Sequence, residues 1–168
     1  DNSGFSLRTP DYQAAGTVAA GIQKRDQLRD TILASITGTN SYEKVRQLNR
    51  WLTEHNEYNT TPDLTTIGNA PHECLSALAG SIGVNGPVCD GYSKAFKVLC
   101  DTLGIPCVLA DGYAKPRAQD TGEAHMWNYV QMDDKGWYGV DVTWNDPMVK
   151  GVSGAKSGYE NEKFLLVG

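Results

Sequence analysis

The hydrophobic pattern of the chain changes at Gly104, from helical spacing before it to strand-like runs after it. Apolar residues from Thr17 to Ile36 recur near helical spacing among charged residues, and Gly38 follows as a stop signal. Asn40 precedes Glu43 at the spacing of a capping box, so we expect a second helix to open there. The apolar stripe of that helix contains Val45, Leu48 and Leu52, flanked by Tyr42 and Trp51.

A third helix is expected from about Val88 to Gly104. It follows a polar loop at 56–71, rich in Asn, Thr, Pro and Gly, and a short helix at about Glu73 to Ala79. Its buried stripe would contain Tyr92, Ala95, Phe96, Leu99 and Leu103. Cys89 lies one helical turn before the first residue of this stripe and therefore falls on the buried face.

Runs rich in β-branched and aromatic residues follow Gly104. The expected strands are Ile105 to Gly112, Ala124 to Met132, Trp137 to Trp144 and a last run at Lys163 to Val167. Helices that precede strands in chain order indicate an α+β fold, with an antiparallel sheet packed against the helix that carries Cys89. We expect residues 1–15 to form an irregular arm and residues 16–168 to form one domain.

The composition is that of an ordinary globular protein, with 168 residues of which 40% are hydrophobic and 21% charged. The formal net charge of −5 and the lack of a basic block argue against nucleic acid or an anionic membrane surface as partners. The sequence has no apolar run long enough to cross a bilayer and no signal-peptide segment at its start. Its cysteines and histidines lack paired ligand spacing, so we expect no metal site and no cofactor.

Cys89 is expected in the first turn of the third helix, directly after a Gly-Pro break at 86–87. Unpaired N–H groups and the positive end of the helix dipole favour the thiolate there, and the thiolate is the reactive form of cysteine. The alternative is a small buried hydrophobe, which is what we expect of Cys74, Cys100 and Cys107. The helix position by itself leaves both interpretations open.

A nucleophilic cysteine needs a base, and His125 is the best placed of the three histidines. Alternation puts it on one face of the second strand with Trp127 and Tyr129. His55 ends the second helix and His72 lies in a loop, where solvated or capping roles are expected. His125 is therefore the candidate base, although a hydrogen-bonded core histidine would show the same pattern.

Asp141 interrupts an apolar strand and would need a partner, because burying a carboxylate alone is costly. His125 is the candidate partner if the two residues share a sheet face. An odd hairpin loop, such as Asp133 to Lys135, places Trp127 opposite Asp141 and makes His125 its diagonal neighbour. We therefore predict an odd register, with a bulge at Gly136.

Residues from Pro87 to Asp146 resemble the core of the transglutaminase-like superfamily, a papain-like group that includes transglutaminases, peptide N-glycanases and many bacterial proteins. The resemblance rests on four segments that follow one another at compatible spacing. They are Val88-Cys89-Asp90-Gly91-Tyr92-Ser93-Lys94-Ala95-Phe96, Leu103-Gly104-Ile105-Pro106-Cys107, His125-Met126-Trp127-Asn128 and Trp137-Tyr138-Gly139-Val140-Asp141-Val142-Thr143-Trp144. The resemblance implies a papain-like fold with the nucleophile at the start of a central helix.

The resemblance also implies roles for particular residues. Cys89 would be the nucleophile, His125 the general base and acid, and Asp141 the carboxylate that orients the imidazole. An upstream aromatic residue often supplies a second oxyanion donor in this family, and Trp51 and Tyr58 are the candidates here. Trp127 and Trp144 are candidates to flank the acyl channel.

The function expected from these residues is thiol-dependent acyl transfer on a peptide or protein carboxamide, with cell-wall peptide among the substrates considered. Water as acceptor would make the protein a protease or amidase, and an amine would make it a cross-linking transglutaminase. The resemblance to bacterial members favours a secreted or cell-surface location. The alternative function is a catalytically idle module that binds or scaffolds a partner; the sequence leaves the oligomeric state open.

Overall fold

The computed structural model describes residues 15–61, 70–115, 118–119, 121–146 and 160–168. The predicted arm at 1–15 falls almost wholly outside these ranges, as does the middle of the loop predicted at 56–71. The helices are α1 (Ala15–Leu33), α2 (Ser41–His55), α3 (Cys74–Leu78), α4 (Cys89–Thr102) and α5 (Val142–Asn145), with 3-10 turns η2 (Ala70–His72) and η3 (Gly83–Asn85). The strands are β1 (Cys107–Ala114), β2 (Glu123–Gln131), β3 (Trp137–Val140) and β4 (Leu165–Val167).

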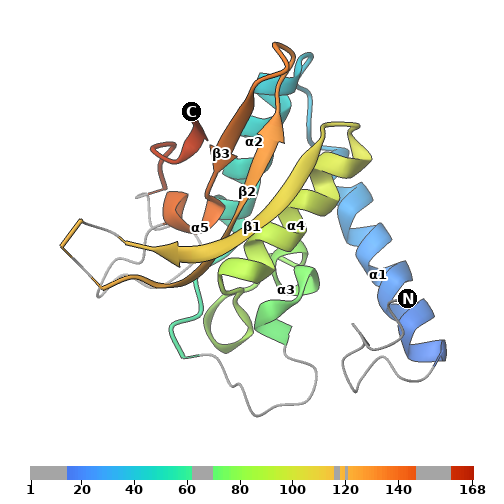
Figure 1. Ribbon diagram of the computed structural model, residues 1–168. Coiled ribbons are helices and arrows are strands. Elements are labelled where there is room, and N and C mark those ends of the chain that lie inside the picture. The colour runs from blue at the N-terminus through green and yellow to red at the C-terminus, as the bar shows by residue number, and fades with distance from the viewer. Residues whose placement is uncertain (1–14, 62–69, 116–117, 120, 147–159) are drawn as a thin grey trace, which may run out of the picture.

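The strands form one antiparallel sheet in the order β1-β2-β3-β4, so the predicted α+β class is confirmed. Helix α4 packs against β1 and β2, and α1 runs along the outer edge of the body (Figure 1). The core lies between α4, α2 and the sheet. Its completely enclosed side chains include Val45, Leu48, Leu52, Tyr92, Ala95, Phe96, Leu99, Val130 and Val140. These include most of the stripes that the sequence predicts for the second and third helices.

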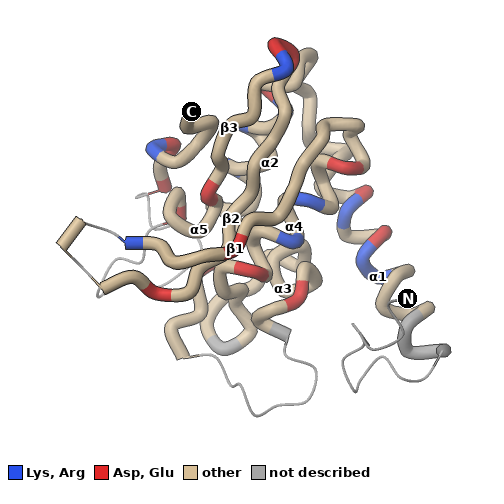
Figure 2. Tube along the Cα trace, in the orientation of Figure 1, with Lys and Arg blue, Asp and Glu red and all other residues tan. Residues whose placement is uncertain are grey.

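The predicted capping box at the start of α2 is present in the structure. Asn40 accepts a hydrogen bond from the Glu43 backbone N–H at 2.9 Å, while the Glu43 carboxylate reaches back to the backbone N–H of Thr39 at 2.7 Å. Helix α1 is held more loosely, since Ile32 is the buried residue among its described side chains, at 19–33, and Ile22 is 46% exposed. Lys and Arg alternate with Asp along α1 (Figure 2), as expected of a solvated helix face.

The odd register predicted for the second hairpin is confirmed. Gln131 pairs with Trp137, and the Met132 N–H donates to the carbonyl oxygen of Gly136 at 2.9 Å, which leaves a three-residue loop. The left-handed residue of this turn is Lys135, with φ of 69°, and the bulge expected at Gly136 stays a prediction. The Gly136 N–H instead donates to the Asp134 carboxylate at 2.9 Å.

The prediction that the third strand continues to Trp144 is wrong, because β3 ends at Val140. Asp141 leaves the sheet and caps α5, and its side chain accepts a hydrogen bond from the Trp144 backbone N–H at 3.0 Å. The β-branched and aromatic residues of this run favour a strand, but an aspartate that can satisfy a free helical N–H favours a helix start. The cap decides the local structure.

A buried carboxyl group joins the far end of α5 to α4. The Tyr92 hydroxyl donates a hydrogen bond to the Asp146 carboxylate, and both side chains are buried. Burial raises the pKa of Asp146 to about 7; the Tyr92 hydrogen bond opposes this, and the charges of Glu160 and Glu57 add to it. Ionised Asp146 is therefore costly in the folded protein.

This shift predicts a pH-dependent effect of Asp146→Asn on stability. The folded pKa of about 7 lies above the ordinary value of 3.8, so the cost of ionisation grows as pH rises from about 4 and is complete above about 7. Asparagine keeps an oxygen that can accept from Tyr92 and removes the charge. We expect the Tm of the variant relative to wild type to be higher at pH 8 than at pH 5, as measured by thermal denaturation.

Asp134→Asn is the matched control for this prediction. Hydrogen bonds from Tyr138 and the Gly136 N–H lower the pKa of Asp134, so neutralising it removes a stabilising charge above pH 4. Its relative Tm should therefore be lower at pH 8 than at pH 3. A Tm difference for Asp146→Asn that stays constant between pH 5 and pH 8 would contradict the burial argument.

Candidate active site

Cys89 is the first residue of α4, as the sequence predicts, and Val88 caps the helix without a side-chain hydrogen bond. The Val88 N–H donates to the carbonyl oxygen of Pro71 at 3.0 Å, which holds the start of the helix against the preceding turn. Cys89 is half-buried. Its sulfur and its backbone N–H lie together at the positive end of the helix dipole.

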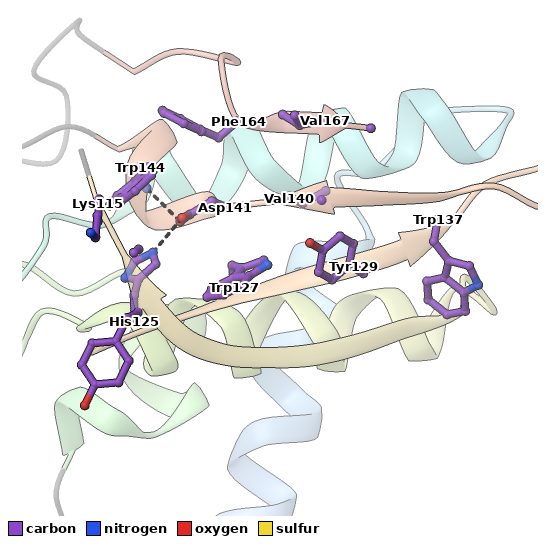
Figure 3. A pocket seen from close by; sticks show the side chains of 14 residues that line it. Lys115, His125, Trp127, Tyr129, Trp137, Val140, Asp141, Trp144, Phe164 and Val167 are labelled. Atoms are coloured by element: carbon purple, nitrogen blue, oxygen red, sulfur yellow. Dashed lines mark hydrogen bonds and ion pairs between the residues drawn. The ribbon is translucent and has the colours of Figure 1, made fainter. Parts of the chain in front are cut away.

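His125 and Asp141 form a buried hydrogen-bonded pair, each with a relative accessibility of 8%. The Nε2 atom of His125 lies 2.7 Å from Oδ2 of Asp141, and Oδ1 of Asp141 accepts the Trp144 N–H (Figure 3). The predicted sharing of one side of the sheet by these two residues is confirmed. Nδ1 is the ring nitrogen that Asp141 does not engage, and the Cys89 side chain lies near enough to the imidazole to help raise its pKa.

Opposing influences act on the protonation of His125. Burial is the largest of them and favours the neutral ring. The hydrogen bonds and negative charges of Asp141 and Cys89 together outweigh burial and raise the pKa of His125 to about 9. The site therefore stabilises an imidazolium ion between a carboxylate and a sulfur atom.

Two polar residues join the helix that carries Cys89 to the strand that carries His125. The Ser93 hydroxyl lies 2.9 Å from both the Cys89 and the Met126 carbonyl oxygens. The amide of Asn128 donates to the Ser93 carbonyl oxygen at 3.1 Å. These bonds fix the sulfur relative to the imidazole. Both residues stand in the family motifs described above, but this bridging role was not predicted. Its signal in the sequence is the placement of Ser93 one turn after Cys89 and of Asn128 on the opposite strand face from His125.

Asp90 organises a second polar cluster beside the thiol. Its carboxylate bonds Nδ1 of His72 at 2.7 Å and Nζ of Lys94 at 2.9 Å, and Lys94 also donates to the His72 carbonyl oxygen. A Cβ atom on Gly91 would lie 2.4 Å from the Pro71 carbonyl oxygen, so this turn packs directly on the helix backbone. His72 is therefore a structural partner of the helix start rather than a solvated side chain.

The tryptophan residues predicted near the site have different surroundings. Trp144 stacks on the His125 ring with centroids 5.1 Å apart, and Trp127 lies 6.1 Å from it on the same strand. Trp51 instead stacks on His55 at 4.3 Å and packs against the core. Trp127 and Trp144 thus flank the imidazole, whereas the contacts of Trp51 are structural.

Tyr58 is half-buried and lies within range of the charge of Cys89. Burial, followed by the negative charge of Cys89, raises the pKa of the Tyr58 hydroxyl to about 12. The hydroxyl therefore stays protonated over the whole physiological range and can donate a hydrogen bond to an oxyanion. Tyr58 is consequently a stronger candidate than Trp51 for the second oxyanion donor.

All four cysteines lie in the described part of the chain and are free thiols. Across the residues that the structure describes, no group of three or more His, Cys, Asp or Glu side chains is arranged to hold a metal ion. None of the described helices combines the length and hydrophobicity required to cross a membrane.

A thiol at the start of a central helix, near an imidazole carried by an antiparallel sheet and a carboxylate that directly follows the third strand, places the molecule in the papain-like fold class. A family model of the transglutaminase-like superfamily matches residues 30–142, more than half of the chain. The chain therefore belongs to the transglutaminase-like superfamily.

Two animal proteins are similar to this chain. The kyphoscoliosis peptidase of Homo sapiens is 26% identical over 130 residues, which cover 74% of this chain and 19% of that protein. Hillarin of Drosophila melanogaster is 25% identical over 144 residues, which cover 80% of this chain and 17% of that protein. The chain spans about a fifth of the length of these curated relatives. The bacterial origin suggested by the sequence is not shown.

Two solved structures share the fold. A Cytophaga hutchinsonii protein with a provisional cysteine protease assignment has a TM-score of 0.54 and 21% identity, and the match covers 71% of this chain and 37% of that one. A TGase structure has a TM-score of 0.57 and 17% identity, with 96% of this chain and 40% of that one covered. At these identities the likeness concerns the fold.

The geometry predicts that Asp141→Asn lowers the pKa of His125. The variant loses the carboxylate charge that opposes burial, so the ring should lose its proton below the value of about 9 in the parent protein. Titration of the His125 ring by nitrogen-15 NMR measures this change. Asp90→Asn, which removes the partner of His72, should leave the His125 titration in place; an unchanged midpoint in Asp141→Asn would contradict the assigned pairing.

Proposed function

We propose that this protein catalyses thiol-dependent acyl transfer on a peptide or protein substrate, with Cys89 as nucleophile, His125 as acid and base, and Asp141 as the group that orients His125. The observation that carries the proposal is the buried hydrogen bond from the imidazole to the Asp141 carboxylate, beside a Cys89 side chain near enough to help raise the pKa of that imidazole. A carboxylate bound to one ring nitrogen fixes the tautomer and stabilises the imidazolium. The other nitrogen is then free to exchange a proton with the thiol.

The reaction has two halves. The Cys89 thiolate attacks the carbonyl carbon, the C–S bond forms, and the oxyanion is met by the Cys89 backbone N–H with the Tyr58 hydroxyl as the candidate second donor. Collapse breaks the C–N bond while His125 gives its proton to the leaving nitrogen, which leaves a thioester. Water or an amine then attacks the thioester, its proton passes to His125, and the thiolate is released.

The similar proteins support both acceptors. One carries the word peptidase and another a provisional cysteine protease assignment, which favours water, whereas the TGase structure favours an amine. Hydrolysis of a peptide or peptide-like polymer therefore ranks at least equally with cross-linking in this proposal. The secreted or cell-surface location expected from the resemblance to bacterial members stays a prediction.

Trapping of the acyl-enzyme tests the proposal. The whole chain is incubated with a library of glutamine-containing peptides and a primary amine, and adducts and products are read by mass spectrometry. Wild type should give a Cys89 thioester and either cleaved, deamidated or amine-bearing peptide, whereas Cys89→Ala should lose at least about a thousandfold in turnover.

Cys74→Ala is the matched control, because Cys74 is a half-buried thiol whose pKa is raised by burial. It should retain wild-type turnover. Iodoacetamide should also label Cys89 faster than Cys74, Cys100 or Cys107 in the wild type. Equal labelling of the four thiols, together with no adduct from any peptide, would favour the idle binding module.

The proposal also predicts the alkaline limit of activity. The leaving nitrogen needs a proton from His125, and the imidazolium is the dominant form of the ring below its pKa of about 9. The value of kcat/KM should therefore hold up to about pH 9 and fall about tenfold per unit above it. Asp141→Asn should shift this alkaline fall of kcat/KM to lower pH. A fall at the same pH in both proteins would mean that a group other than His125 causes it.

A further inference from the structure

The side of the sheet that carries His125, Trp127 and Tyr129 is hollowed into a groove of about 440 Å³. Aromatic residues dominate its lining, and Figure 3 shows them in a row that starts at His125 and Trp144 and ends at Trp137. Gln131 pairs with Trp137 and lies six positions after His125 on β2. Six positions correspond to roughly 20 Å of extended chain. The groove is therefore long enough for several residues of a bound peptide.

The groove lies on the imidazole side of the reaction centre. His125, Asp141 and Trp144 line it, whereas Cys89 does not. In the proposed reaction the leaving nitrogen takes its proton from His125, so that nitrogen must lie at the imidazole when the C–N bond breaks. The part of the substrate attached to that nitrogen then continues into the space beside His125. By the same geometry, an acceptor amine would arrive from this space in the second half of the reaction.

The groove is apolar and open to solvent beyond Trp127. Trp137 is 46% exposed, Tyr129 39% and Val167 48%, so three large apolar side chains on three strands face the same space. Gly139 pairs with Tyr129, and its lack of a side chain keeps the floor between Tyr129 and Val167 open. Burial of an aromatic or large aliphatic side chain against such a surface lowers the free energy of binding.

Charge points to the same kind of occupant. Among the residues that the structure describes, the charged or titratable lining residues other than tyrosine are Lys115, His125 and Asp141, and the last two are bonded to each other. Lys115 lies at the His125 end, so the stretch from Trp127 to Trp137 presents neutral side chains. A charged substrate side chain would lose hydration in that stretch without gaining a partner.

Given the proposed acyl transfer, we propose that this groove binds the amine-bearing half of the substrate and selects an aromatic or large aliphatic side chain there. In a peptide substrate this half is the segment that follows the scissile bond. In a cross-linking reaction it is the chain that carries the acceptor amine. The preference arises from Tyr129, Trp137 and Val167, which lie beyond the reacting groups.

The test uses the full chain and two peptides that differ at one position on the amine side of the reacting bond, which carries tryptophan in one and glycine in the other. The position is chosen by a scan of the three residues that follow that bond. Wild type should prefer the tryptophan peptide in kcat/KM by about tenfold or more, and Trp137→Ala should remove most of that preference by lowering kcat/KM for the tryptophan peptide far more than for the glycine peptide. An unchanged preference, equal losses for both peptides, or no preference in wild type would overturn the proposal.

Tyr42→Ala is the matched control, since Tyr42 is an exposed aromatic residue on α2 that does not line the groove. It should keep the wild-type preference. Equal melting temperatures and equal rates of Cys89 labelling by iodoacetamide show that Trp137→Ala leaves the fold and the thiol unchanged. If sedimentation shows that the chain forms a dimer that Trp137→Ala dissociates, the groove is an interface between copies and the proposal fails.

A binding measurement separates this proposal from the proposed chemistry. The Cys89→Ala protein is titrated with each peptide, and the shifts of the tryptophan indole N–H signals are followed by NMR. Tighter binding of the tryptophan peptide that Trp137→Ala weakens about tenfold supports the groove even if wild type turns over no peptide. Equal binding of both peptides overturns it even if wild type proves to be an active acyl-transfer enzyme.

Discussion

The site depends on the carboxylate of Asp141, because its two oxygen atoms make two different structural hydrogen bonds. One oxygen holds His125, and the other caps α5 by accepting the Trp144 N–H. The cap ends the third strand and turns the chain so that the Trp144 ring lies over the imidazole that the same carboxylate orients. Asp141 therefore determines both the orientation of the His125 ring and the placement of Trp144 over it.

A second set of hydrogen bonds brings the sulfur to that imidazole. Ser93 and Asn128 tie the first turn of α4 to β2, so helix and strand approach each other through polar contacts in an otherwise apolar interface. Side-chain hydrogen bonds of this kind specify one arrangement, whereas packed aliphatic side chains tolerate sliding. On the other side of the helix, the Pro71 carbonyl packs against Gly91 and Asp90 binds His72, so the thiol is held from both sides.

Local signals in the sequence account for much of this structure. The Asn40 cap, the stripe from Tyr92 to Leu99 and the odd hairpin loop each depend on neighbours within one turn, and each is present in the structure. The end of β3 at Val140 could not be predicted from such local signals. The strand preference of the residues from Trp137 to Trp144 competes there with helix capping by Asp141.

Contacts between distant segments were the least predictable part of the site. The stacking of Trp51 on His55 and the role of His72 depend on which side chains the fold brings together. The aromatic groove likewise needs β2, β3 and the C-terminal strand to lie side by side, which the spacing of residues along the chain does not reveal.

Helix α5 spans only Val142–Asn145, and both of its ends are fastened by carboxyl groups. Asp141 binds one end to the sheet, and Asp146 joins the other to Tyr92 in the core. Because burial raises the pKa of Asp146 to about 7, ionisation of this carboxyl group destabilises the folded protein in alkaline solution, whereas in mild acid the group is protonated and the cost is smaller. Trp144 lies between these two ends, so the cover that its ring gives to the imidazole depends on both carboxyl groups.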